Sequence, residues 1–229
     1  MTNKRYKNWL VPGLLLLLGS INVISGAFQL DTIMQGPPAV PDEMMTMEYF
    51  SMPVPIVLHI LAGVIFNLMG PLQFAPITWG RWAGWHRWSG RLLVLSGFLI
   101  AGTGLWMNHV YPQYGGLFKY PGIVVNSLGL AVALGIALQA VRSSDRDIAK
   151  HRKWMMRAVA FGLGPATQRV VIIPYFLIFG IPDDWMIGLV IWMGFLINLA
   201  VVEFVLARNR RGRQSSANLT LKTLLDKKV

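Results

Sequence analysis

The sequence predicts an all-α membrane protein: a bundle of six transmembrane helices with both termini in the cytoplasm. Of its 229 residues, 54% are hydrophobic and 14% are charged, with a mean hydropathy of +0.50. Soluble domains carry about 25% charged residues. Six apolar stretches have the length of about 20 residues that crosses about 30 Å of hydrocarbon. These features exclude a soluble globular enzyme and a disordered chain.

The six spans are expected to form one domain over residues 1–207, followed by a basic cytoplasmic tail over 208–229. We expect them near residues 9–29, 53–74, 92–110, 123–141, 154–179 and 185–207. The first span begins with basic residues and a Leu14–Leu18 run, a pattern that also occurs in signal peptides. We interpret it as a retained helix.

Basic residues set the expected orientation. Nineteen of the 21 Lys and Arg residues fall in the N-terminus, the second and fourth connections and the tail. Lys119 falls on the other side, and Arg169 lies inside the fifth span. Because basic connections stay in the cytoplasm, we expect both termini on the inner side of the cytoplasmic membrane. Topology and attraction to anionic lipid headgroups account for the net charge of +11 without a nucleic-acid partner.

The chain contains no cysteine. This excludes a disulfide framework, a Cys-ligated iron–sulfur cluster, covalent haem attachment and thiol catalysis within it. A metal or haem would have to bind His, Met or carboxylate side chains. No closely spaced His, Asp and Glu cluster of the kind that holds a metal ion stands out in the sequence.

Polar residues inside spans are costly and indicate function. Four of them fall at similar depth, in or near the outer half of the membrane: His59, Asn126, Gln168 and Arg169. We expect a polar pocket among these helices, because an arginine inside a membrane is too expensive to be idle. In the alternative, Arg169 bonds backbone carbonyls freed by Pro165 or Pro174, and His59 is a satisfied core residue.

One face of the second span carries His59, Gly63, Asn67 and Gly70, spaced by four, four and three residues. The glycines predict close helix approach, and Asn67 is expected to bond across a helix interface. This packing interpretation leaves His59 unexplained.

Two His-Arg motifs precede outward-running helices. They read His86-Arg87-x-x-Gly90-Arg91 and His151-Arg152-x-Trp154-Met155-x-Arg157. Cations at a helix N-terminus oppose the helix dipole by about 0.3–1 kcal/mol each, so these clusters favour an anionic partner. Lipid phosphates, haem propionates, a phosphorylated substrate and an acidic redox partner all meet that requirement.

Haem b is the candidate cofactor. His86 and His151 are the expected ligands of the haem iron, provided that the third and fifth helices are neighbours. Propionate groups would then be neutralised by Arg87, Arg91, Arg152 and Arg157. His59 and His109 form a possible second pair toward the outer side.

At these motifs the chain resembles a family of small bacterial predicted multi-pass membrane proteins of unknown function. The shared features are a His followed by Gly-Pro-x-Gln (His59, Gly70, Pro71 and Gln73) and the two His-Arg motifs. This resemblance covers about residues 50–165 and implies no established activity. A looser similarity is to six-helix di-haem b-type cytochromes, whose His pairs join alternate helices. The fourth span has no His, so the similarity implies one haem or none.

Two functions follow. The first is haem- or quinone-linked electron transfer through His86 and His151, with a quinone or redox protein as partner. The alternative is a non-enzymatic membrane component: a small transporter, an anionic-lipid binder or an assembly factor. A His-dependent enzyme acting on lipid ranks third, because no nucleophile motif is present.

Overall fold

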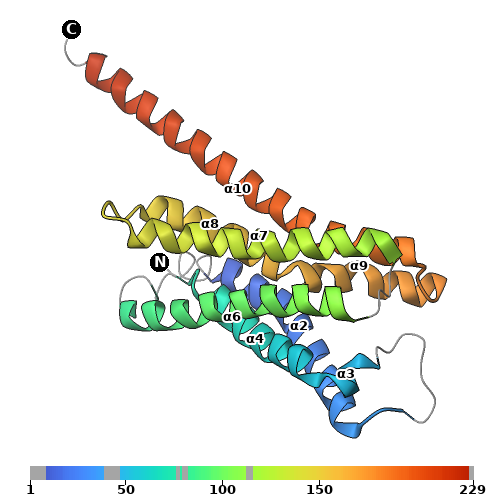
Figure 1. Cartoon of the computed structure of the whole chain (residues 1–229). Helices are drawn as coiled ribbons and strands as arrows, with labels where there is room; N and C mark the ends of the chain where they lie inside the picture. The colour runs from blue at the N-terminus through green and yellow to red at the C-terminus, as the bar shows by residue number, and fades with distance from the viewer. Residues whose placement is uncertain (1–8, 39–46, 76–77, 79–81, 112–115, 227–229) are drawn as a thin grey trace.

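The computed structural model describes residues 9–38, 47–75, 78, 82–111 and 116–226 (Figure 1). Their regular structure is helical. The helices are α2 (Leu10–Gln35), α3 (Glu48–Ser51), α4 (Pro53–Leu72), α6 (Ala83–Val110), α7 (Gly116–Arg142), α8 (Ile148–Gly162), α9 (Gly164–Phe179) and α10 (Asp184–Asp226).

Six segments are long and apolar enough to cross a membrane, which confirms the predicted number of spans. They are Leu10–Gln35, Pro53–Leu72, Ala83–Val110, Gly116–Arg142, Ile148–Phe179 and Asp184–Gly212. Most exceed the predicted ranges. The third begins at Ala83 rather than at residue 92, so the first His-Arg motif lies in the opening turns of α6. Hydropathy marks only the part of a helix inside the hydrocarbon, and the helix continues beyond it.

The fifth span consists of two helices separated at Leu163. Pro165 has no N–H to offer the carbonyl four residues earlier, so the regular hydrogen-bond ladder stops there. The chain bridges the gap with a tighter turn, in which the amide of Ala166 donates to the carbonyl of Leu163 at 3.0 Å. This break places residues from the end of α8 and the start of α9 side by side.

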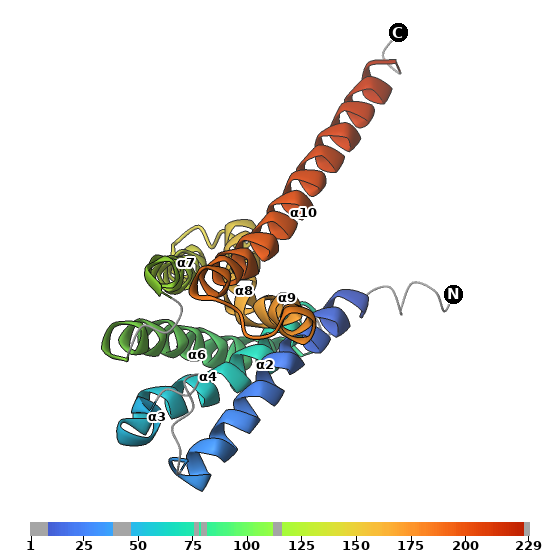
Figure 2. The same cartoon turned by 90° about the vertical axis from the view of Figure 1, so that its right-hand side faces the viewer.

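The helices pack in a closed circuit. α2 lies on α4, α4 on α6, α6 on α7, α7 on α10, α10 on α9, and α9 returns to α2, while α8 packs mainly on α7 and α10. Figure 2 shows α7, α6, α4 and α2 following one another across the bundle, with α9 and α10 on the other side. The C-terminal part of α10 projects away from the bundle (Figures 1 and 2).

An apolar core fills the centre of the bundle between α4, α6, α7 and α8. Its members include Phe66, Leu93, Leu130, Leu134 and Val159. The ring of Phe66 is 1% exposed and occupies the space where a side chain at Gly162 would lie. Small residues thus allow the backbones to approach, which is how helices associate in lipid.

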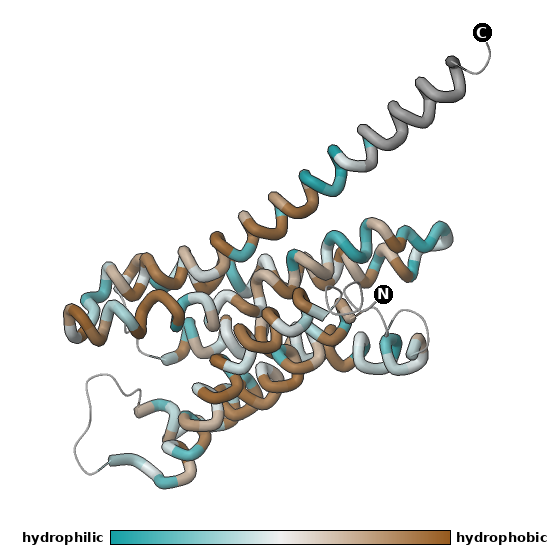
Figure 3. The backbone as a smooth tube through the Cα atoms, turned by 180° about the vertical axis from the view of Figure 1, so that it is seen from behind, coloured by the Kyte–Doolittle hydropathy of each residue, from teal (hydrophilic) through white to brown (hydrophobic). Residues whose placement is uncertain are grey.

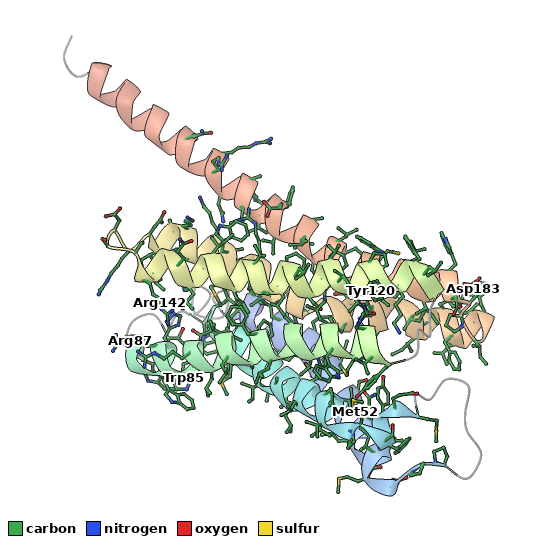
Figure 4. All side chains as sticks on the ribbon, in the orientation of Figure 1. Met52, Trp85, Arg87, Tyr120, Arg142 and Asp183 are labelled. Atoms are coloured by element: carbon green, nitrogen blue, oxygen red, sulfur yellow. The ribbon has the colours of Figure 1, made fainter. Side chains whose placement is uncertain are left out.

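The two ends of the bundle differ in charge. Trp85, Arg87 and Arg142 lie at one end, which we call the basic end, whereas Met52, Tyr120 and Asp183 lie at the other (Figure 4). We call the second end the acidic end, because Asp31, Glu48, Asp183 and Asp184 belong to its helix termini. Figure 3 shows hydrophobic residues along the crossings and hydrophilic residues gathered toward their ends.

Candidate functional site

A cavity of about 480 Å³ lies between the helices, in the half of the bundle that leads to the acidic end. All six crossings contribute to its wall. Its polar lining residues are Gln29, Tyr49, His59, Asn108, Tyr111, Lys119, Asn126, Ser127, Gln168 and Arg169. The structure therefore brings together the four intramembrane polar residues that the sequence placed at one depth. What they bind stays a prediction.

Arg169 of α9 is held in place by neutral partners. Its Nε donates to Ser25 Oγ at 3.0 Å, and its Nη1 donates to Asn22 Oδ1 at 2.9 Å and to the Pro165 carbonyl at 3.0 Å. No carboxylate of the described residues pairs with it. One donor does reach a backbone carbonyl, but it is that of Pro165 itself and not one of those that Pro165 and Pro174 leave free, which belong to residues 161 and 170. The two N–H groups of Nη2 remain available to the cavity that Arg169 lines.

A chain of amides connects Arg169 to α4. Asn22 Nδ2 donates to Asn67 Oδ1 at 3.1 Å, and Asn67 Nδ2 donates to the Gly63 carbonyl at 2.7 Å. Asn67 thus bonds across a helix interface, as its position in the sequence predicted. These bonds fix the acceptor oxygen of Asn22 toward the guanidinium, so the orientation of Arg169 depends on three helices.

Gly63 has a different role from the one that the sequence predicted. A Cβ at Gly63 would meet nothing within 4 Å, so no helix approaches closely there. Instead, Gly63 lines a second cavity of about 90 Å³ that shares His59 and Arg169 with the larger one. Gly70 is buried, but a Cβ there would make only ordinary van der Waals contact with Leu93, at 3.5 Å.

His59 is anchored through one ring nitrogen. Its Nδ1 lies 2.9 Å from Thr103 Oγ1, while the Thr103 hydroxyl donates to the Leu99 carbonyl. The Thr103 oxygen is therefore the acceptor, and the neutral imidazole donates from Nδ1. This assignment leaves Nε2 with a lone pair that can accept a hydrogen bond from a ligand.

Asn126 and Gln168 face the cavity from α7 and α9. The Oδ1 atom of Asn126 is buried and has no hydrogen-bond partner among the described residues. Gln168 Nε2 donates to the Ile191 carbonyl at 3.3 Å, and its side chain packs against Gly194. A buried acceptor without a partner is costly, so Asn126 marks a place where a bound molecule or water donates.

Aromatic and basic residues line the cavity toward the acidic end. The Tyr111 hydroxyl donates to the Met52 carbonyl at 2.7 Å, and its ring meets Tyr49 edge to face at 5.4 Å. Burial raises the pKa of the Tyr111 hydroxyl, and the neighbouring Tyr49 and Glu48 raise it further. Lys119 of α7 lies near Asp184.

The first span contributes to the site, which the sequence did not predict. Asn22, Ser25 and Gln29 recur at spacings of three and four, which places them on one face of α2. Asn22 and Ser25 bind Arg169, and Gln29 lines both cavities. The spacing of these three residues could have indicated a polar face on the first span. That span is otherwise leucine-rich, however, and nothing in its sequence points to Arg169 as the partner of this face.

The histidines expected to bind haem lie at the basic end. His151 Nδ1 donates to the Ala137 carbonyl of α7 at 2.8 Å, and His86 Nδ1 is buried without a partner among the described residues. His86 is near enough to His151 to feel its charge.

The helices that carry these histidines, α6 and α8, share α7 as a neighbour. α6 and α8 pack on α7 rather than extensively on each other. Ser89 and Leu93, which follow His86 on α6, have no exposed surface. Haem ligation by His86 and His151 stays an untested prediction.

The remaining candidates have separate environments. His109 lies at the end of α6, 3.4 Å from the Tyr120 hydroxyl, and does not line the cavity with His59. Arg157 forms a two-bond ion pair with Glu203 of α10, at 2.6 and 3.0 Å, so its charge is already neutralised. The other arginines of the two motifs lie in the first turns of α6 and α8: Arg87, Arg91 and Arg152.

The fold and the cavity define a helical integral membrane protein with six spans. The family model described as "Predicted membrane protein (DUF2306)" matches residues 56–206, more than half of the chain, and the chain belongs to this family. The match confirms the resemblance to predicted membrane proteins of unknown function. No significant similarity connects the chain to a curated protein or to a solved structure.

Proposed function

We propose that this protein is a non-enzymatic component of the cytoplasmic membrane that binds an anionic ligand in the cavity at Arg169. One observation carries the proposal: a guanidinium inside a membrane span has neutral partners, faces a cavity and pairs with no carboxylate of the described residues. Ligand binding of this kind suits a small transporter or a receptor for an anionic lipid headgroup.

The energetics favour an anion over a neutral ligand. A charged side chain at the membrane centre costs about 3 kcal/mol or more, and a bound anion offsets much of that cost. Of the two cationic side chains in the cavity wall, Lys119 lies near Asp184, whereas Arg169 pairs with no carboxylate of the described residues. The guanidinium of Arg169 therefore attracts anions.

Binding is tested with purified full-length protein in neutral detergent, using methyl phosphate as the probe. Thermal unfolding should shift upward with probe concentration, by about 2.7 kcal/mol of stabilisation at one hundred times the dissociation constant. Arg169→Leu should abolish this shift. Arg169→Lys should weaken it, because lysine keeps the positive charge but cannot bind two phosphate oxygens in the bidentate geometry of a guanidinium. Arg142→Leu, at the basic end, is the matched control and should bind as wild type. A folded Arg169→Leu protein with unchanged probe binding would contradict the proposal.

Orientation forms part of the same proposal. The charge rule assigns the basic end and both termini to the cytoplasm, so the cavity leads to the outer side. Because the chain has no cysteine, single-cysteine variants report accessibility directly. In intact cells, a membrane-impermeant thiol reagent should label Asp183→Cys and spare Ser144→Cys. Labelling of Ser144→Cys alone would reverse the assignment.

Haem- or quinone-linked electron transfer through His86 and His151 is the second candidate. It is favoured by the unpartnered His86 Nδ1 and by the proximity of the two rings. A reduced-minus-oxidised absorption spectrum of the purified protein separates the two functions. A Soret band lost in His86→Ala and His151→Ala would support electron transfer, and a colourless wild-type protein would reject haem.

A further inference from the structure

The cavity offers hydrogen-bond acceptors as well as a cation. Asn126 Oδ1 is buried and has no partner among the described residues. His59 Nε2 is also an acceptor, because Nδ1 is the nitrogen that donates to Thr103. A simple anion such as phosphate or sulfate satisfies Arg169 but leaves these acceptors unpaired, since it has few or no protons to donate.

The acceptors come from two helices of the cavity wall, His59 from α4 and Asn126 from α7. A Cβ built on Gly104 of α6 would lie 3.3 Å from Ser127 Oγ and 3.5 Å from His59 Cε1. Gly104 thus marks the place where α4, α6 and α7 converge, and Asn126 lines the same cavity from α7. Arg169 belongs to α9, which lies across the circuit of helices.

We propose that the ligand is a hydroxylated anion, with an anionic oxygen for Arg169 and at least one O–H group for Asn126 and His59. This inference rests on the proposed anion-binding function. Ammonium donors do not suit the site, because Arg169 is cationic and none of the lining residues is Asp or Glu. Uncharged hydroxyls donate without adding positive charge. A polyol phosphate has this chemistry, either as a free molecule or as the headgroup of a glycerol-bearing phospholipid.

The test compares two probes that share the phosphate and differ in hydroxyl groups. Wild-type protein in neutral detergent should bind glycerol 1-phosphate about fivefold more tightly than methyl phosphate, which corresponds to one additional hydrogen bond. Asn126→Ala should lose this preference and bind the two probes equally tightly. Gln139→Ala, on the same helix but outside the cavity, should keep the preference.

A lipid arm identifies the source of the ligand. In nanodiscs of neutral lipid doped with anionic lipid, the protein should enrich phosphatidylglycerol over phosphatidic acid, as measured by mass spectrometry of copurified lipid. Preference in the lipid arm alone assigns a lipid headgroup, and preference among the free probes alone assigns a soluble molecule. Either result supports the hydroxylated anion.

The outcomes separate the two proposals. Equal wild-type affinity for both free probes, together with no lipid preference, overturns the hydroxyl requirement while anion binding at Arg169 stands. A preference that survives in folded Asn126→Ala overturns the assigned role of Asn126. Absence of binding of either phosphate and of either lipid overturns both proposals. If Asn126→Ala does not fold, the affinities of the wild-type protein for glycerol 1-phosphate and methyl phosphate still decide whether the ligand needs a hydroxyl group.

Discussion

Gly129 of α7 lies directly against the ring of Phe161, which lines the cavity. Replacing Gly129 with alanine tests how tightly α7 packs against α8 at this point. A Cβ at this position would overlap the ring, which also packs on Phe195 with a centroid separation of 5.9 Å. Forced overpacking costs about 1–3 kcal/mol. The matched control is Gly135→Ala on the same helix, where a Cβ meets nothing within 4 Å and helix propensity gains up to about 1 kcal/mol.

Both variants gain helix propensity equally, so they should differ only by the cost of overpacking, about 1–3 kcal/mol in the free energy of unfolding. Reversible unfolding by SDS in mixed micelles, followed by tryptophan fluorescence, measures this difference. Because Phe161 also lines the cavity, Gly129→Ala should weaken methyl phosphate binding, whereas Gly135→Ala should not. Equal stability and equal binding of the two variants would refute the packing of α7 against α8 described above.

Two further predictions concern other contacts. Gly104→Ala should lower ligand affinity by narrowing the cavity between Ser127 and His59, while Gly102→Ala, whose Cβ meets nothing within 4 Å, should bind as wild type in the same titration. Glu203→Gln should lose about 1 kcal/mol or less of stability, since the ion pair with Arg157 is partly exposed. Restored stability in the reversed pair, Arg157→Glu with Glu203→Arg, would show that the pairing itself matters, and a further loss would argue against it.

Much of the candidate site was predictable from position along the chain. A helix rises about 1.5 Å per residue, so counting from the ends of the spans placed His59 and Arg169 at similar depth. Both residues line the same cavity. The cost of burying polar groups in lipid supplied the reason to single them out.

The partners of these residues were not predictable. Arg169 bonds to Asn22, which is 147 residues away, and Arg157 pairs with Glu203, 46 residues away. Counting along each span gives the depth of a residue in the membrane, but many residues of the six spans share the same depth. Only the rotation of each helix about its axis and the choice of neighbours decide which side chains meet.

The sequence by itself determined that the chain is helical and has six spans, because lipid offers no hydrogen bonds to the backbone and each crossing must satisfy its own. The tertiary structure decided the circuit of helices, the break at Leu163 and the shape of the cavity. Lipid tails are as apolar as the helix surfaces, so burial of apolar groups does not select neighbours. Close fits such as Phe66 against Gly162 make that selection, and hydropathy along the chain contains no record of them.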